Sequence, residues 1–223
     1  MLTARNPHVL PDRMPVFPLS GLVVLPFGHV PLNIFEPRYL NMVNDVLGGP
    51  RIIAMVQPRN TFPDDLVPDD AALFDVGTAA RIISFHDTGD GRYHLTLEGV
   101  SRFRVSAIHA IDATRGYREV SADYTDYPDD QLPSEETEGP GRERLLELLR
   151  EFFTAKDIPA DWSSVDESPY EALVSSLTMS CPFEPGEKQA LLECESHAAR
   201  AQMLISLFEM SLSSGYSPGG LTH

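Results

Sequence analysis

Short apolar segments separated by proline and glycine fill the first half of the chain. Their branched and aromatic residues are typical of β-strands, and the residues between them are typical of turns. The pattern predicts strands at residues 31–35, 51–56, 76–85, 93–97, 103–108 and 117–124, and a strand, a tight turn and a second short strand within 16–25. Asp90-Gly91 predicts a hairpin. Strands at this spacing favour a small closed barrel or a sandwich.

One helix interrupts this region, because the apolar spacing changes to three and four residues after Pro37. Five residues then share one helical face: Tyr39, Met42, Val43, Val46 and Leu47. Gly48-Gly49-Pro50 follows, which predicts a C-cap and the end of the helix.

In the second half of the chain, apolar residues recur at intervals of three and four, which is the spacing of amphipathic helices. It predicts helices at residues 142–153, 168–180, 187–193 and 196–212. Ser168-Pro169-Tyr170-Glu171 predicts an N-cap with a capping box for the second of them. The residues expected to point inward are Leu145, Leu146, Leu149, Phe152 and Phe153 in the first helix, and Met203, Leu204, Leu207, Phe208 and Ser211 in the last. Short helices with short links are expected to pack as a bundle.

A polar, acidic stretch separates the two halves. The sequence therefore predicts an α+β protein with an N-terminal extension over 1–13, a β subdomain over 14–125, a linker over 126–141, a helical bundle over 142–213 and a tail over 214–223. A chain of 223 residues can bury a core without disulfides. Cys181 and Cys194 lack nearby Cys or His partners, so neither a bridge nor a zinc site is expected.

Charge narrows the classes of partner. The formal net charge of −16 repels phosphate backbones, which disfavours nucleic acid. Residues 1–14 contain no apolar signal-peptide core, and no apolar run approaches the roughly 20 residues that span a bilayer, so a cytoplasmic location is expected. Acidic clusters within 64–70 and 123–138 lack the spacing of a calcium loop and are expected to be solvated.

Catalytic motifs are missing from the sequence. The only lysines, Lys156 and Lys188, do not form a plausible Ser-Lys pair, and residues 139–142 fail as a phosphate-binding loop. The seven histidines include no HExxH motif. His86 and His94 flank the predicted hairpin, either as a functional pair or as two ordinary strand-end residues. These features predict a binding module without a cofactor, and not an enzyme.

Several motifs, in a fixed order, carry a resemblance to a known family. They are Pro15-Val16-Phe17-Pro18-Leu19, Val24-Leu25-Pro26-Phe27-Gly28, Pro31-Leu32-Asn33-Ile34-Phe35-Glu36-Pro37-Arg38-Tyr39, Val76-Gly77-Thr78, Leu97-Glu98-Gly99 and Arg102-Phe103-Arg104-Val105. From about residue 14 to 212 the chain resembles the amino-terminal, substrate-recognition domain of the ATP-dependent Lon proteases. The resemblance implies a PUA-like β-barrel followed by a helical bundle, here as a standalone protein without the ATPase and protease domains.

The same resemblance implies partners and a function. The expected partners are proteins or unfolded polypeptide segments, including a protease or a chaperone, and the expected role is an adaptor or a modulator of proteolysis. Two alternatives stay open. One is RNA binding, because PUA-like barrels also occur in RNA-binding proteins, and the other is a small-molecule sensor or weak hydrolase.

Nine residues are candidates for binding: Phe35, Glu36, Arg38, Tyr39, Phe62, Phe74, Phe85, Arg102 and Arg104. Glu36 and Arg38 either contact a ligand or fix the turn before a helix by pairing with each other or with the backbone. The two later arginines either contact anions or pair with nearby carboxylates. The phenylalanines at 62, 74 and 85 border predicted loops, where they either form an exposed patch or close the barrel ends.

Overall fold

The chain divides into two compact units, Met1–Pro133 and Ser134–His223. A computed structural model describes residues 9–62, 66–132 and 139–213. The predicted tail over 214–223, most of the N-terminal extension, and the acidic residues 64, 65, 135, 136 and 138 lie outside the described residues.

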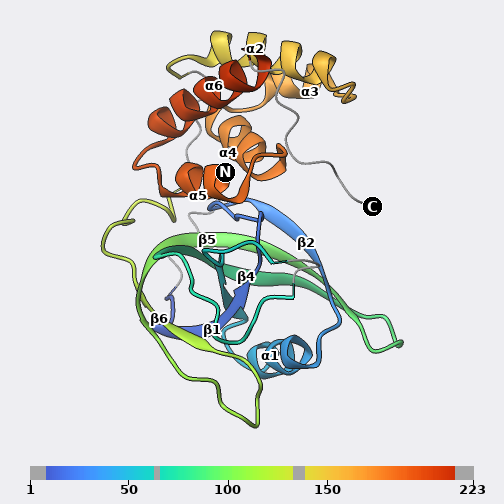
Figure 1. The fold of residues 1–223 in the computed structure, drawn as a ribbon, viewed down its shortest axis with the longest axis vertical. Helices are drawn as coiled ribbons and strands as arrows, with labels where there is room; N and C mark the ends of the chain where they lie inside the picture. The colour runs from blue at the N-terminus through green and yellow to red at the C-terminus, as the bar shows by residue number, and fades with distance from the viewer. Residues whose placement is uncertain (1–8, 63–65, 133–138, 214–223) are drawn as a thin grey trace, which may run out of the picture. The chain divides into compact units, whose positions relative to one another are not determined.

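The first unit is built on one mixed sheet and one helix (Figure 1). Its elements are β1 Arg13–Pro18, β2 His29–Ile34, α1 Pro37–Leu47, β3 Ile52–Val56, β4 Val76–Asp87, β5 Tyr93–Ile108 and β6 Glu119–Asp123. The strand order is β2-β5-β4-β3-β1-β6, and β6 also pairs with β5. This second pairing closes β5, β4, β3, β1 and β6 into a barrel, and β2 lies outside the ring beside β5.

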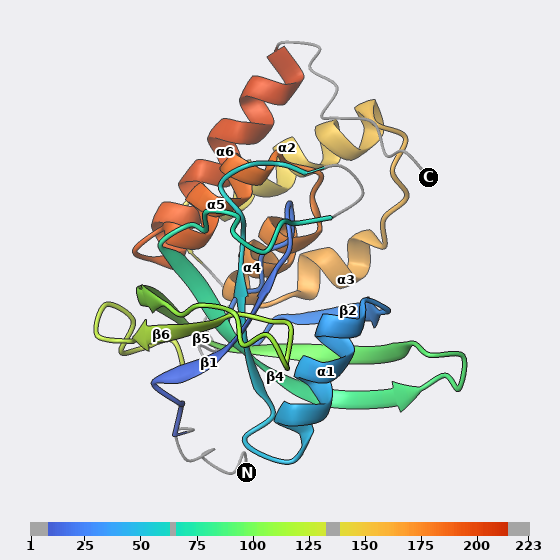
Figure 2. The ribbon, with the colours of Figure 1, turned by 60° about the horizontal axis from the view of Figure 1, so that its bottom comes forward.

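The sixteen-residue strand β5 joins the barrel to the outer strand. Its first half pairs with β2, its second half pairs with β6, and β4 pairs along almost its whole length. The prediction of two strands at 93–97 and 103–108 was therefore wrong. The register shifts between Ala79 and Ala80, whose partners are Ser101 and Gly99, so β5 carries a bulge at its centre. The outer ends of β4 and β5 extend as a hairpin (Figure 2).

Gly99 is the point where another segment of backbone crosses β5. The amide of Phe27 donates to the Gly99 carbonyl at 2.8 Å, and the Gly99 amide donates to the Gly28 carbonyl at 2.9 Å. A Cβ atom on Gly99 would lie only 2.1 Å from the Leu25 carbonyl oxygen. The predicted second strand within 16–25 is absent, since this crossing makes only a single bridge, between Pro26 and Gly99.

The barrel interior and the inner face of α1 hold the core of this unit. Every residue of β3 is buried, as expected from its unbroken apolar run. The core cluster includes Val16, Ala54, Phe103 and Val120, each at most 1% exposed. In α1 the predicted apolar face is confirmed, except that Leu47 is only half-buried, and Gly48 is the C-cap.

The second unit is a bundle of helices. They are α2 Arg142–Ala155, α3 Trp162–Glu167, α4 Tyr170–Ser180, α5 Pro185–Glu193 and α6 His197–Ser213. Its core is made of apolar residues from α2, α4, α5 and α6, including Leu145, Leu149, Phe152, Val174, Leu191, Leu204 and Phe208. No helix in the described part of the chain is both long and apolar enough to cross a membrane. Both cysteines are buried thiols that form no disulfide in the described part of the chain.

Several sequence predictions for this bundle need correction. The predicted capping box at residue 168 is wrong, because Ser168 is the C-cap of α3, which has no buried residue and was not predicted. The helix after it begins at Tyr170. The capping box observed joins Glu184 and Glu187 at the start of α5. The inward face of α2 also differs, since its buried set includes Leu148, whereas residues 146 and 153 are only half-buried. In α6 the buried set includes Ala201 and Ile205, whereas the predicted residues 203, 207 and 211 are only half-buried.

The crossing at Gly99 gives a direct test of this fold. Gly99→Ala places a methyl group against a backbone carbonyl that cannot rotate away, so we expect the free energy of unfolding to fall by about 3 kcal/mol. Gly48→Ala is the matched control, because its Cβ would lie no closer than 3.9 Å to other atoms and its φ of −77° suits alanine. Urea denaturation of both variants measures the difference. Equal stabilities would contradict the tight crossing.

Candidate functional site

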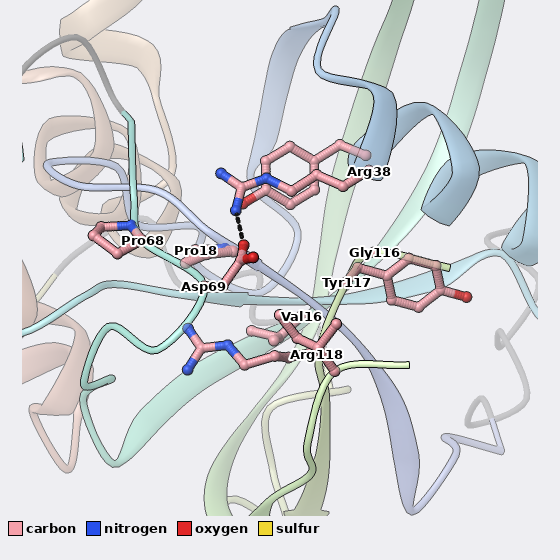
Figure 3. Close-up of a pocket in the computed structure, with 10 residues that line it drawn as sticks. Val16, Pro18, Arg38, Pro68, Asp69, Gly116, Tyr117 and Arg118 are labelled. Carbon is pink, nitrogen blue, oxygen red and sulfur yellow. Dashed lines mark hydrogen bonds and ion pairs between the residues drawn. The ribbon is translucent and has the colours of Figure 1, made fainter. Parts of the chain in front are cut away.

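A small pocket lies beside the N-terminus of α1 (Figure 3). Its walls come from β1, the start of α1, the segment before β4 and the loop before β6. The lining residues are Val16, Pro18, Arg38, Tyr39, Pro68, Asp69, Ile111, Gly116, Tyr117 and Arg118. Two of them, Arg38 and Tyr39, were candidates from the sequence. Asp69 and Arg118 were missed, because no local pattern marks them as neighbours of the helix.

The start of α1 fixes the first wall of the pocket. Glu36 is extended, Pro37 occupies the first turn, and the Glu36 carbonyl accepts from the amides of Tyr39 and Leu40 at 3.0 Å. The Arg38 guanidinium donates to the Glu36 carboxylate through Nε at 3.0 Å and Nη2 at 2.8 Å. The predicted pairing of Glu36 with Arg38 is therefore confirmed, and it holds the arginine over the helix start.

Arg38 also reaches the segment before β4. Its Nη1 donates to Asp69 Oδ1 at 2.5 Å and its Nη2 donates to the Val67 carbonyl at 3.0 Å. The guanidinium lies 4.6 Å from the centre of the Tyr39 ring. That ring is 4% exposed and packs edge-on against Phe17 at 4.5 Å, and burial raises the pKa of Tyr39 to about 12. The tyrosine hydroxyl therefore keeps its proton at neutral pH.

Arg118 supplies the opposite wall. Its carbonyl accepts from the Val16 amide at 3.0 Å, which ties it to β1. Its Nη1 donates to the Ala71 carbonyl at 2.8 Å, whereas its Nη2 is buried and has no hydrogen-bond partner among the described residues. Burial lowers the pKa of Arg118, but arginine stays protonated in proteins. Arg118, a lining residue of the pocket, thus has one buried charged donor for which the described residues supply no acceptor.

The loop before β6 holds this geometry close to α1. Gly116 has a φ of +80°, and a Cβ on it would lie 3.3 Å from the Arg38 Cβ, so both its conformation and its space favour glycine. Asn41 Nδ2 donates to the Arg115 carbonyl at 3.2 Å. The Tyr117 hydroxyl donates to Asp45 Oδ2 at 2.6 Å. These contacts fix the helix and the loop on either side of the pocket.

The pocket is suited to binding an oxygen atom. Its interior volume of about 10 Å³ matches one water molecule, so it accepts a single oxygen and not a whole metabolite. The lining includes no Ser, Cys, His or Lys that would act as a nucleophile or base. No group of three or more His, Cys, Asp and Glu within the described ranges is arranged to hold a metal ion. His86 and His94 lie opposite each other on the exposed hairpin, with ring centres 6.5 Å apart.

The candidate phenylalanines lie outside the pocket lining. Phe35, at the end of β2, is 58% exposed. Phe85 is 40% exposed on the β4–β5 hairpin, where its ring is 5.0 Å from that of Tyr93. Phe62 and Phe74 are half-buried. Two of the four therefore offer substantial apolar surface for a partner.

Arg102 and Arg104 both form ion pairs in the structure. Arg102 is 5% exposed, and its Nη2 donates to Asp130 Oδ1 at 2.7 Å while its Nε and backbone amide donate to Asp130 Oδ2. The exposed Arg104 donates to Asp126 at 2.8 Å. The ion-pair alternative is thus confirmed for both arginines. The first residues of the predicted linker are bonded to β5.

The two ion pairs differ in burial, which gives a matched comparison. Asp130→Ala leaves a buried guanidinium without its carboxylate, so we expect the free energy of unfolding to fall by about 3 kcal/mol. Asp126→Ala breaks an exposed pair and should cost less than about 1 kcal/mol. Urea denaturation measures both. Similar losses for the two variants would contradict the assignment of Arg102 to a structural role.

Comparison with known proteins places the chain in a family. Residues 13–209 match the ATP-dependent protease La (LON) substrate-binding domain. The chain is 27% identical to Lon protease 2 of Sorangium cellulosum over 203 residues and 28% identical to Lon protease 2 of Myxococcus xanthus over 209 residues. These alignments cover 88% and 91% of this chain, but in each case 24% of the relative. The chain thus spans about a quarter of the length of those proteases.

Solved structures agree in fold. The Lon N-terminal domain protein from Xanthomonas campestris aligns with a TM-score of 0.61 and 22% identity, covering 87% of this chain and 97% of that one. The N-terminal domain of the Lon protease from the Mycobacterium avium complex aligns with a TM-score of 0.60 and 15% identity, covering 88% and 98%. With a family match over most of its length, the chain belongs to the ATP-dependent protease La (LON) substrate-binding domain family.

Proposed function

We propose that this chain is a non-catalytic module that binds polypeptides and acts as an adaptor or modulator of proteolysis in the cytoplasm. The observation that carries the proposal is the buried Nη2 of Arg118, which has no hydrogen-bond partner among the described residues and belongs to a side chain that lines a pocket of one-oxygen size. A carbonyl or carboxylate oxygen of a polypeptide would complete its hydrogen bonding. Family membership supports a role in recognising protein substrates.

The energetics of Arg118 favour a ligand oxygen. A buried donor without an acceptor costs about 1 to 3 kcal/mol, and more when it is charged. An incoming oxygen recovers that cost, and little has to be reorganised because Arg38 and Ala71 already fix the walls. Asp69 is 62% exposed and bonds to Arg38, so it forms the solvent-exposed rim of the pocket.

A polypeptide fits this site better than the two alternatives. A small metabolite is too large for the pocket interior, whereas a polypeptide can insert one oxygen and lay its apolar side chains on nearby surface, such as Phe35. Nucleic acid needs a basic stripe. Exposed arginines including Arg13, Arg59 and Arg104 instead lie within ion-pair distance of carboxylates.

The extent of the match to Lon proteases supports the proposed adaptor role. The alignments with Lon proteases cover about a quarter of each relative. Residues 1–223 are proposed to carry the recognition step, while ATP-driven unfolding and cleavage belong to other protein segments or to a partner such as a protease or a chaperone. Binding here would set which polypeptides reach that machinery.

Fluorescence anisotropy with a labelled, reduced and carboxymethylated lactalbumin tests the proposal. The unfolded probe should bind saturably, and native lactalbumin should bind far more weakly. Arg118→Gln should raise the Kd about tenfold, because one charged hydrogen bond contributes about 1.5 kcal/mol.

Arg92→Gln is the control, since it removes the same charge from the exposed hairpin tip and should leave the Kd unchanged. Thermal unfolding of both variants separates loss of binding from loss of fold. Absence of binding by the folded protein, or an unchanged Kd for Arg118→Gln, would refute the proposed site.

A further inference from the structure

An open groove of about 420 Å³ lies at the C-terminal end of α2, in the helical unit. Its lining residues are Phe153, Thr154, Asp157, Ile158, Pro159 and Trp162. A groove of this size can accommodate one or two large side chains, although it is open to solvent and does not enclose them. The groove shares no residue with the pocket beside α1.

Aromatic rings form the groove wall. The centres of Phe153 and Trp162 are 5.8 Å apart, and both side chains are half-buried against the bundle core. The Arg150 guanidinium lies 5.5 Å from the tryptophan ring and donates to both oxygens of Asp166. Trp162 is therefore held in place while part of its surface still faces the groove, which is suited to an apolar or aromatic side chain.

Asp157 has a backbone conformation and a position at the end of α2 that are both unfavourable for an aspartate. Its φ is +54°, in the left-handed region that glycine and asparagine prefer at helix ends. The Ile158 amide donates to the Phe153 carbonyl at 2.9 Å, so this residue closes α2 in a Schellman-type turn. A carboxylate at a helix C-terminus also opposes the helix dipole. Asp157 and the terminal carbonyls of α2 together concentrate negative charge at the groove.

The surroundings extend this negative charge. Residues 134–223 contain 16 Asp and Glu against six Lys and Arg, a net charge of −10. Asp161, the N-cap of α3, accepts hydrogen bonds from the hydroxyls of Ser163 and Ser164 and stays ionised. Two basic groups are near: Arg150 is paired with Asp166, and Lys156, the residue before Asp157, also interacts within the protein. An approaching cation is therefore favoured and an approaching anion is repelled.

We propose that this groove binds a polypeptide segment in which an aromatic side chain stands beside a lysine or arginine. The aromatic side chain packs against Phe153 and Trp162, and the neighbouring cation pairs with Asp157. The inference goes beyond the proposed function, because it concerns a separate unit of the chain and holds whether or not the Arg118 pocket binds polypeptide.

The intrinsic fluorescence of the full chain reports this binding directly, since Trp162 is the only tryptophan. The probe is a capped octapeptide, without tryptophan, that contains two phenylalanines each followed by lysine. We expect a saturable change in emission. A matched peptide with glutamate for lysine, and another with alanine for phenylalanine, should each bind at least tenfold more weakly.

Asp157→Asn separates binding from structure. Asparagine keeps the left-handed turn and removes only the charge, so the thermal midpoint should stay equal or rise, while the Kd for the lysine peptide increases at least fivefold. Glu195→Gln removes an equal charge from an exposed residue of the same unit outside the groove lining and should change the Kd less than twofold.

Three outcomes would overturn the inference: no saturable binding of the lysine peptide by fluorescence and calorimetry, equal affinity for the lysine and glutamate peptides, or an unchanged Kd for Asp157→Asn. The Arg118→Gln variant should bind the lysine peptide normally. Its behaviour therefore distinguishes failure of this groove from failure of the site beside α1.

Discussion

The backbone contact between Gly99 and residues 25–28 is the constraint on which the first unit depends. Only a residue without a side chain allows this approach, because a Cβ would lie 2.1 Å from the Leu25 carbonyl. The crossing coincides with the bulge in β5, and beyond it the strand pairs with β6. That pairing closes the barrel. The β5–β6 pairing also brings the segment before β6 against β1, and this contact places Arg118 in the wall of the pocket.

Local chemistry explains why part of this site was predictable from sequence. Glu36 and Arg38 are two residues apart at a helix start, so their pairing follows from short-range geometry. Arg118 and Asp69 join the same pocket through strand pairing and loop packing, which no local pattern encodes. The sequence left two roles open for Arg102, contact with an anionic ligand or pairing with a carboxylate. The buried ion pair with Asp130 in the structure decides for the second.

In the fold, too, some elements were predictable from local sequence patterns and others were not. Strands and helices with a regular apolar period were predicted, including β3 and α1. The prediction failed in two places. Separate strands were expected at 93–97 and 103–108, although β5 continues through a bulge at its centre. Ser168 suggested a helix start, although it ends the short α3. Both errors arise because the same residue types serve starts, ends and irregularities.

The electrostatics of the two units suggest how an acidic protein can recognise polypeptides of varied sequence. In the first unit most exposed arginines are paired with carboxylates, and the half-buried Arg118 has one buried donor without an acceptor among the described residues. In the second unit, carboxylate charge lies beside an aromatic wall. A polypeptide carries both carbonyl oxygens and basic side chains, so the two proposed sites select for complementary features of one class of ligand.

Hydrogen–deuterium exchange of the full chain, with and without a saturating unfolded polypeptide, tests whether the pocket beside α1 binds polypeptides. We expect slower exchange on binding for the amides around Asp69 and around Arg118, because a ligand oxygen in the pocket ties these two segments together. Saturated binding that leaves exchange in both segments unchanged would contradict the claim that this pocket is where the chain recognises polypeptides.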